Sequence, residues 1–309
     1  MMDASEQLRR VAFGVGYRML GSVADAEDIA QESLARLLAS GDAPANAEAW
    51  VTTVATRLSI DQLRSARRQR EQYFGEWLPE PLVDGGAERA TDASGHAELA
   101  DDLSLAFLVL LETLSPTERA AFLLHDVFDF SYGETARALE RPSEASVRQL
   151  VSRARARISE RMPRYEVSSD EQSRLVDRFI AACEQGEVAP FVELLAADVV
   201  FTGDGGGKVP PGFAISRPVR GLQAVAKVFA SFSRRAVFPA HLEAASIGGA
   251  PGVVVIADLP RGGGLMGVLG FAMRAGRIAE IDGVVNPEKL GHLAGVYGGL
   301  ADYSVVSRL

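Results

Sequence analysis

Residues 131–158 read SYGETARALERPSEASVRQLVSRARARI, and this stretch predicts two helices joined by a tight turn. Ser131 and Glu134 fit the S-x-x-E capping box that begins a helix, because each satisfies a free amide of the first turn. Residues 140–142 supply the turn, and Ser143 is the expected N-cap of the second helix.

The second of these helices has an apolar back and a polar front. The expected buried side chains are Val147, Leu150, Val151, Ala154 and Ile158. The expected DNA-reading side chains are Arg148, Gln149, Ser152, Arg153 and Arg155. Arginine binds guanine bidentately, glutamine pairs with adenine, and additional arginines neutralise phosphates. The pattern therefore predicts a helix-turn-helix that reads DNA, the alternative being a helical pair with a purely structural role.

The charge of the chain is distributed unevenly. The net charge of −9 argues weakly against nucleic-acid binding, and residues 1–165 carry 19 Arg and no Lys against 26 acidic residues. Two basic stretches nevertheless interrupt this acidic half, with five Arg in residues 57–70 and seven in residues 141–164. Either stretch alone could be a solvated helix face, but two on one chain favour phosphate binding.

Length and composition predict a multi-domain globular protein. With 309 residues, 47% hydrophobic and 24% charged, the chain has room for two or three domains. Helical periodicity predicts an all-α domain over residues 1–71 and another over 97–165, joined by a linker at 72–96. Residues 169–309 are expected to form an α+β domain. An amphipathic helix with Leu175, Phe179, Ile180 and Cys183 on one face is expected to open it, and a second helix lies near 222–232. Its expected strands lie at 199–201, 252–257, 265–273 and 278–285.

Several classes of protein are disfavoured by what the sequence lacks. No run of about eighteen apolar residues predicts a membrane span, and the first residues are too polar for a signal peptide. A single cysteine, Cys183, allows no disulfide framework, and the four histidines are too far apart for a local metal motif. We therefore expect a cytoplasmic chain that needs neither a metal nor a cofactor.

The linker contains large apolar side chains that are costly to leave in water. Tyr73, Phe74, Trp77 and Leu78 lie among prolines, glycines and acidic residues that cannot bury them locally. Some of these four are expected to pack on a neighbouring domain.

Two blocks of the front half resemble the extracytoplasmic-function (ECF) sigma factors. LETLSPTERAAFLLHDVFDFSYGETARAL, at residues 111–139, together with the second helix resembles region 4, which reads the promoter −35 element. DAEDIAQE, at residues 25–32, resembles the core-binding helix of region 2, and residues 49–71 resemble the segment that melts and reads the −10 element. The resemblance implies binding to core RNA polymerase, through its β′ and β subunits, and to double-stranded promoter DNA.

The same resemblance assigns residues to these roles. The implied core-binding residues are Asp25, Asp28, Gln31 and Glu32, and Asp25, Asp28 and Glu32 also form an acidic stripe on one helix face. The implied −10 residues are Arg57, Arg64, Arg67 and Arg68. Two positions depart from the family pattern: Arg57 stands where many relatives carry Asn, so no base-flipping role is transferred to it, and Glu140 stands where Gly is common.

The C-terminal domain resembles the SnoaL-like cone, in which helices cover a curved sheet. An ECF subgroup carries this extension together with a W-L-P-E-P linker motif and a D-G-G-G-K-like motif. The first motif is Trp77, Leu78, Pro79, Glu80 and Pro81, and the second is Asp204, Gly205, Gly206, Gly207 and Lys208. In that subgroup the extension implies regulation in cis, with no separate anti-sigma factor required.

Other readings of the C-terminal domain remain open. The glycine motif could be an ordinary loop after a strand; it is not a P-loop, because Val209 stands where Ser or Thr would bind Mg²⁺. The cone could bind a small ligand or act as an enzyme, with Asp204, His241, Asp258 and Asp282 as candidate acids or bases. A stand-alone helix-turn-helix regulator, or a cone-fold enzyme or sensor fused to one, is the alternative to a sigma factor.

Overall fold

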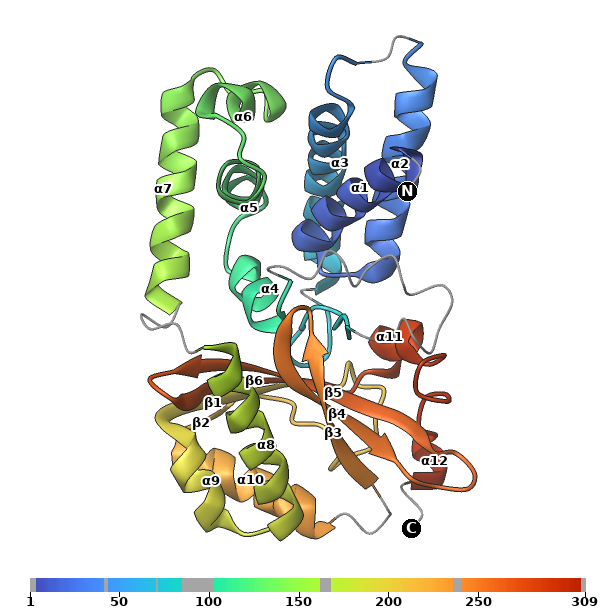
Figure 1. The fold of residues 1–309 in the computed structure, drawn as a ribbon, viewed down its shortest axis with the longest axis vertical. Helices are drawn as coiled ribbons and strands as arrows, with labels where there is room; N and C mark the ends of the chain where they lie inside the picture. The colour runs from blue at the N-terminus through green and yellow to red at the C-terminus, as the bar shows by residue number, and fades with distance from the viewer. Residues whose placement is uncertain are drawn as a thin grey trace. The chain divides into compact units, whose positions relative to one another are not determined.

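The computed structural model describes residues 4–41, 44–70, 72–84, 103–161, 168–235 and 240–306. The chain divides into two compact units, which are treated separately below (Figure 1). Unit 1 comprises Met1–Gln72 and Leu108–Met162, and unit 2 comprises Tyr73–Phe107 and Pro163–Leu309. Within the described ranges, no helix combines the length and the apolar character needed to cross a membrane.

The first part of unit 1 is a bundle of three helices. These are α1 (Ala4–Leu20), α2 (Val23–Ala39) and α3 (Ala47–Arg70). Gly21, in the left-handed region with φ of 67°, ends α1, and Ser22 then caps α2 by accepting a hydrogen bond from the Asp25 amide. A Cβ on Gly16 would lie 3.1 Å from the Ala26 Cα, so this glycine permits the close approach of α1 and α2.

The second part of unit 1 contains the helix-turn-helix. Its elements are α4 (Leu105–Glu112), which begins in unit 2, then α5 (Pro116–Phe122), the π-helical turn η4 (Leu123–Val127), α6 (Tyr132–Ala138) and α7 (Glu144–Arg161). The predicted capping box of Ser131 and Glu134 is confirmed, and Ser143 accepts from the Ser146 amide at 3.3 Å. Glu140 adopts φ of 53°, which explains why glycine suits this turn.

Glu118 joins α5 to α7. Its carboxylate closes the capping box with Ser115 and also accepts from Arg153 Nε at 3.0 Å and Arg157 Nη1 at 2.8 Å. Burial of Glu118 opposes ionisation, but the hydrogen bonds from Ser115 and Arg153 outweigh it and lower the pKa of this carboxyl. One acidic side chain therefore fixes both the start of α5 and the position of α7.

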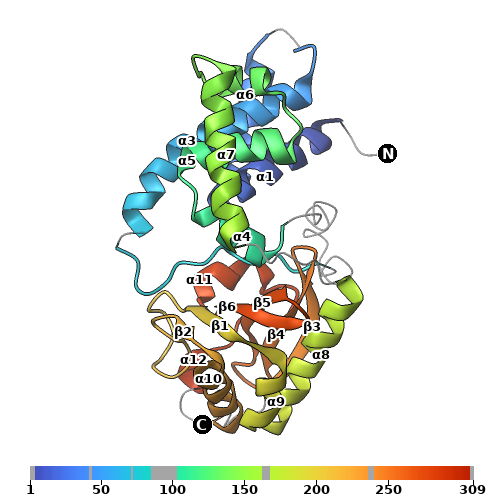
Figure 2. The ribbon, with the colours of Figure 1, turned by 90° about the vertical axis from the view of Figure 1, so that its left-hand side faces the viewer.

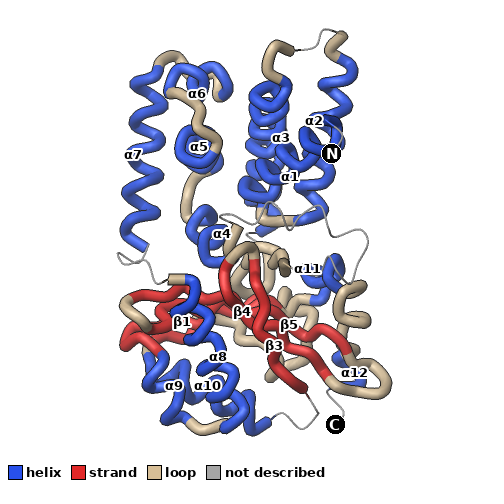
Figure 3. Tube along the Cα trace, viewed as in Figure 1, coloured by secondary structure: helices blue, strands red, loops and turns tan. Residues whose placement is uncertain are grey.

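Unit 2 is built on a six-stranded sheet with the order β2-β1-β6-β5-β4-β3. Its strands are drawn in red in Figure 3. The strands are β1 (Leu195–Asp204), β2 (Val219–Arg220), β3 (Ala240–Ile247), β4 (Ala250–Ala257), β5 (Gly264–Arg274) and β6 (Arg277–Val284). All neighbours are antiparallel except β1 and β6, which are parallel and bring Asp204 opposite Val284. The segments that follow these two strands therefore start side by side, although they are far apart in the sequence.

Helices cover one face of this sheet (Figure 2). They are α8 (Ser169–Gln185), α9 (Val188–Leu194) and α10 (Leu222–Arg235), while α11 (Pro287–Leu290), η5 (Gly291–Leu293) and α12 (Tyr303–Val306) follow β6. Five phenylalanines fill the space between helices and sheet, with ring centroids 4.7–5.9 Å apart: Phe179, Phe191, Phe201, Phe229 and Phe271. The interior of the cone is thus a packed aromatic core.

The predicted fold class, two helical domains followed by an α+β domain, is confirmed. The four predicted strands and the helix near residues 222–232 are present. β2, β3 and the separate helix α9 were not predicted, and the predicted restart of helix at residue 97 lies partly outside the described residues.

Replacing Glu118 by Ala should destabilise the packing of α7 on α5. Two charged hydrogen bonds and a cap are lost, and because both arginines are half-exposed we expect about 1.5–3 kcal/mol. Native-state hydrogen exchange of α5 and α7 amides in the full-length chain measures this loss.

Glu134→Ala is the matched control, since the Glu134 carboxylate closes the same kind of capping box with Ser131, whereas that of Glu118 also accepts from two arginines. Because the pKa of Glu118 is lowered on folding, its contribution is complete above the unfolded pKa of about 4.3 and is lost as the pH falls further. Equal effects of the two substitutions would contradict the linking role of Glu118.

Candidate DNA-reading, polymerase-binding and linker-docking sites

The predicted −35-reading side chains all lie on the exposed side of α7. Gln149 and Ser152 occupy its centre, directly opposite the buried Val147, Val151 and Ala154. The three arginines lie on the flanks of this face, and each forms an ion pair within unit 1.

The flanking arginines are held by carboxylates. Arg148 donates to Glu144 at 3.0 Å and lies 5.0 Å from the ring centroid of Tyr132. Arg155 pairs with Asp126, and Arg153 with Glu118. These pairs leave about half of each arginine side chain exposed, so the arginines are oriented rather than removed from the surface.

The predicted −10-reading residues of α3 are only partly described. Arg64 pairs with Asp61 at 3.3 Å on the surface, while the side chains of Arg67 and Arg68 lie outside the described part. Arg57 contacts the end of α6: it donates to the carbonyl oxygens of Ala138 at 2.7 Å and Arg137 at 3.0 Å. It also pairs with Glu140 at 3.2 Å. A cation suits the free carbonyl groups at a helix C-terminus.

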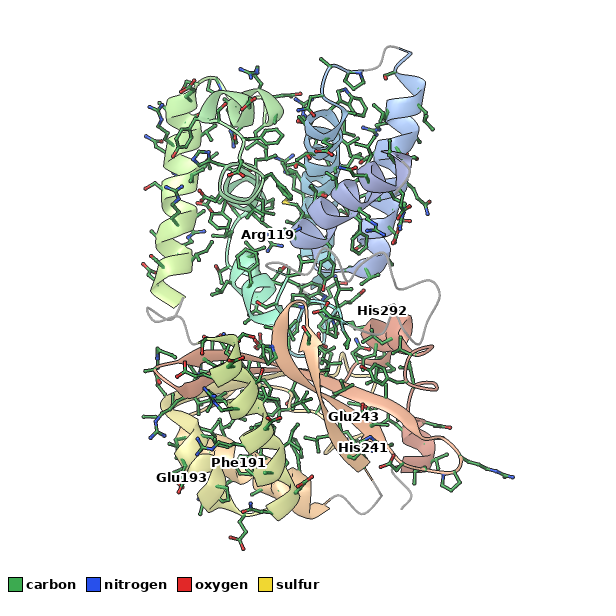
Figure 4. The ribbon with its side chains drawn as sticks, in the orientation of Figure 1. Arg119, Phe191, Glu193, His241, Glu243 and His292 are labelled. Carbon is green, nitrogen blue, oxygen red and sulfur yellow. The ribbon has the colours of Figure 1, made fainter. Side chains whose placement is uncertain are left out.

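Two further arginines join the three-helix bundle to the helix-turn-helix part of unit 1. Arg119, labelled in Figure 4, is fully buried and donates to the Met19 carbonyl oxygen at 2.6 Å and to Glu112 at 2.7 Å. Arg18 lies 5.6 Å from the ring centroid of Phe128. We call Arg18, Arg57 and Arg119 the arginine seam.

The predicted polymerase-binding residues lie on α2. Asp28, Gln31 and Glu32 are exposed, whereas Asp25 is half-buried and accepts from Gln62 of α3 at 2.7 Å. The same exposed face ends in Leu38, whose side chain is 85% accessible. An isolated apolar side chain at the end of an acidic stripe was missed by the sequence analysis, because helical periodicity alone does not say that a leucine is uncovered.

Asp204, the last residue of β1, receives the linker. Its Oδ1 accepts from the Tyr73 hydroxyl at 2.6 Å, and its Oδ2 accepts from the Leu78 amide at 2.8 Å and from Lys289 Nζ at 2.7 Å. The Asp204 side chain is fully buried, so a partner for each oxygen is required. Burial and the adjacent Asp204 carboxylate raise the pKa of Tyr73.

Lys289 completes this arrangement from α11. Its ammonium also donates to the Leu78 carbonyl oxygen and lies 3.9 Å from the ring centroid of Trp77. The residue is buried, so its charge is compensated by the Asp204 carboxylate, a carbonyl oxygen and an aromatic face. We call Tyr73, Trp77, Leu78, Asp204 and Lys289 the linker anchor.

The glycine motif forms the wall of the linker anchor. Gly206 and Gly207 have φ of 55° and 69°, and a Cβ on Gly206 would lie 2.6 Å from the Tyr73 hydroxyl. Gly205 accepts a turn bond from the Lys208 amide at 2.8 Å. The Lys208 side chain instead pairs with Glu288 at 2.7 Å on the surface, away from the buried charge.

The remainder of the W-L-P-E-P motif is largely buried in unit 2. Pro79 and Pro81 are buried, Glu80 is half-buried, and the Pro81 carbonyl oxygen lies 2.9 Å from His292 Nε2. Phe74, in contrast, is 67% exposed, so only some of the four large linker side chains are covered.

Lys289, Asn286 and His292 were missed as candidate residues. Asn286 caps α11 and donates to the Tyr73 hydroxyl at 2.8 Å. The available signal was the sequence NPEKL after the last strand, in which Asn-Pro begins a helix and places the lysine one turn later.

The four candidate acid–base residues do not converge. His241 and Asp258 do contact each other, at 2.6 Å, but they are half-exposed at the β3 edge of the sheet, where His241 also contacts Glu243 (Figure 4). Burial raises the pKa of Asp282 on β6 to about 8, and Asp204 belongs to the linker anchor. Two strands lie between His241 and Asp282. In the described ranges no group of three or more His, Cys, Asp or Glu could hold a metal ion.

A three-helix bundle with an acidic face, followed by a helix-turn-helix, defines the class of sigma-70-type factors. The Sigma-70 region 2 family model matches residues 5–69, and the Sigma-70 region 4 model matches residues 104–158.

Comparison with whole proteins narrows the class. The chain is 38% identical over 292 residues to the ECF RNA polymerase sigma factor SigJ of Mycobacterium tuberculosis, covering 92% of this chain and 91% of SigJ. It is 32% identical over 295 residues to the probable ECF sigma factor SigI of that organism, covering 92% and 93%. The crystal structure of M. tuberculosis SigJ aligns with a TM-score of 0.73 at 34% identity, covering 93% of this chain and 96% of that one. The chain belongs to the ECF RNA polymerase sigma factor family.

Replacing Gln149 by Ala should relax selectivity at one position of the −35 element by about 1–3 kcal/mol, because Gln149 lies at the centre of the exposed α7 face. Selection from a randomised promoter library measures this change. Arg157→Ala is the control, since Arg157 lies about two turns beyond Gln149 on α7 and outside the predicted base-reading residues. Equal loss of base preference in both variants would contradict the placement of Gln149.

Replacing Lys289 by Met should lower the free energy of unfolding by about 3–5 kcal/mol, because the Asp204 charge would remain buried without its cation. Lys208→Met is the control, because Lys208 forms an exposed ion pair with Glu288, the residue next to Lys289. We expect this substitution to change the free energy of unfolding by no more than about 0.5 kcal/mol. Urea unfolding of the full-length chain compares them. Similar losses of unfolding free energy in both variants would show that the buried Lys289–Asp204 pair contributes no more to stability than the exposed Lys208–Glu288 pair.

Proposed function

We propose that this sigma factor directs core RNA polymerase to its promoters through three surfaces: the exposed face of α2, the basic part of α3 and the exposed face of α7. The single observation that carries this assignment is the acidic α2 face, with Asp28, Gln31 and Glu32 exposed. A stand-alone helix-turn-helix regulator would have no use for such a surface.

The α2 face suits a basic partner surface, in this family the coiled coil of the β′ subunit. Leu38 would add an apolar contact at the end of the stripe, where its exposure is otherwise unfavourable. Further contacts with the β subunit belong to the same proposal.

Promoter reading is assigned to α3 and α7. Gln149 and Ser152 would contact base edges of the −35 element, and Arg148, Arg153 and Arg155 would contact phosphates or guanines after exchanging their carboxylate partners for DNA. Arg57, Arg64, Arg67 and Arg68 would bind the −10 region in the same way, with Arg57 first leaving α6.

The C-terminal unit is proposed to regulate this activity in cis. The linker between regions 2 and 4 is bound at the linker anchor, so any state in which the linker must extend has to break the hydrogen bonds of Tyr73 and Leu78 and leave the Asp204–Lys289 ion pair without these partners. Polymerase would shift the equilibrium by its differential affinity for the released state, with no separate anti-sigma factor needed.

The alternative of an enzyme or a small-molecule sensor receives less support. The described interior of the cone is filled by phenylalanine rings, and the candidate acids and bases do not share one site. We therefore propose a protein that binds and positions rather than one that catalyses a reaction. As a partner of the polymerase it would act in the cytoplasm.

Reversing Asp28 and Glu32 to Lys should weaken binding to core polymerase at least tenfold and reduce run-off transcription accordingly, because attraction becomes repulsion. The effect should shrink as the salt concentration rises.

Reversing the exposed Asp177 and Glu184 of α8 makes the same change in net charge and is the control. Unchanged affinity of the Asp28 and Glu32 variant at low salt would refute the assignment of α2. A wild-type chain that gives no promoter-specific transcript with core polymerase would refute the proposed function as a whole.

A further inference from the structure

The β3–β4 hairpin, at the edge of the sheet, also binds the linker. The Gly248 amide donates to the Leu82 carbonyl oxygen at 2.8 Å, and the Asp84 amide donates to the Ser246 carbonyl oxygen at 2.8 Å. Val83 forms an antiparallel bridge with Ile247. Residues 82–84, which directly follow the W-L-P-E-P motif, therefore extend the sheet beyond β3.

The Asp84 side chain fixes the register of this pairing. Its Oδ2 accepts from the Ser246 hydroxyl at 2.5 Å and from the Gly249 amide at 2.6 Å. A carboxylate that accepts from both the strand end and the turn can satisfy these donors in only one alignment. The contact is thus specific for this segment of the linker.

The chain just before α4 touches the same turn. A Cβ on Gly248 would lie 2.0 Å from the Leu103 carbonyl oxygen, so only glycine permits this approach. The turn geometry alone does not require glycine here. The β5–β6 hairpin has an equivalent two-residue turn with φ of 51° and 69°, and its first position is Ala275. The absence of a side chain at Gly248 is therefore explained by Leu103.

We propose that the Gly248–Gly249 turn is a second linker-docking site, which holds both ends of residues 85–102 and thereby withholds their length from the connection between regions 2 and 4. This inference rests on the proposed function, because only promoter binding demands that regions 2 and 4 separate.

The length of chain between residues 84 and 103 is comparable with the spacing of the two promoter elements. The withheld stretch has 102 − 84 = 18 residues, which span roughly 60 Å when extended. By their numbering the −10 and −35 elements are about 25 base pairs apart, roughly 85 Å of B-DNA. In the free chain the arginine seam holds α3 and α6 in contact within unit 1. Opening the seam without releasing the second docking site would leave the connection between the two reading helices shorter by these 18 residues, roughly 60 Å of extended chain.

Amide hydrogen exchange on the free full-length chain tests the docking without polymerase. In the wild type, the amides of Asp84 and Gly248 should exchange slowly. Gly248→Ala, through the clash with Leu103, and Asp84→Ala, through loss of its two accepted bonds, should each raise both exchange rates at least tenfold. Gly276→Ala, at a hairpin turn with φ of 69° and no atom within 4 Å of the added Cβ, should leave them unchanged. Asp84→Ala leaves the hairpin sequence intact and keeps the test valid if Gly248→Ala fails to fold.

Run-off transcription with core polymerase tests the consequence. Both docking variants should raise output about threefold to tenfold over the wild type, since about one or two hydrogen bonds no longer oppose release, and Gly276→Ala should not. Fast exchange at Asp84 in the wild type would overturn the second docking site. Lost protection with unchanged output would overturn its role in withholding the linker while leaving the proposed function intact. The absence of any wild-type transcript would instead overturn the proposed function.

Discussion

The ion pair between Lys289 and Asp204 is the interaction on which the organisation of this sigma factor depends. Both side chains are buried, and the free energy of desolvating them is offset only when the linker is present, because the Leu78 amide and carbonyl group, the Tyr73 hydroxyl and the Trp77 ring complete their coordination. Without the linker, a charged pair would face water through an incomplete shell. The linker is therefore part of the C-terminal unit's own structure, and this explains why Tyr73–Phe107 belongs to unit 2.

Arginines perform the corresponding task in unit 1. The face of α7 that would read the −35 element is flanked by arginines paired with Glu118, Asp126 and Glu144, and Arg57 of α3 binds the end of α6. Exposed ion pairs of this kind contribute little to stability and can exchange partners readily. Under the proposed function, the free chain would keep these arginines ordered and neutralised until phosphates replace the carboxylates, in agreement with a protein whose overall charge is negative.

Structure that depends on neighbouring residues could be predicted from the sequence, whereas contacts between residues far apart in the sequence could not. The helix-turn-helix follows from Ser131, Glu134 and the periodicity of α7, because caps and amphipathic faces are set by neighbours three or four residues apart. The DGGGK motif could be placed after a strand, but not opposite Lys289, because their meeting depends on the parallel pairing of β1 with β6. β3 was missed because AHLEAASI alternates only over its first five residues and is rich in alanine and glutamate, which are depleted in strands. The role of Arg153 also needed the structure, since no spacing rule joins it to Glu118.

The most direct test of the central claim is amide hydrogen exchange at Leu78, whose amide donates to Asp204, measured in the free chain and in the chain bound to core polymerase. Docking of the linker at Asp204 predicts strong protection in the free chain, loss of that protection in Lys289→Met, and faster exchange once the linker is released on the polymerase. Fast exchange at Leu78 in the free wild-type chain would contradict it.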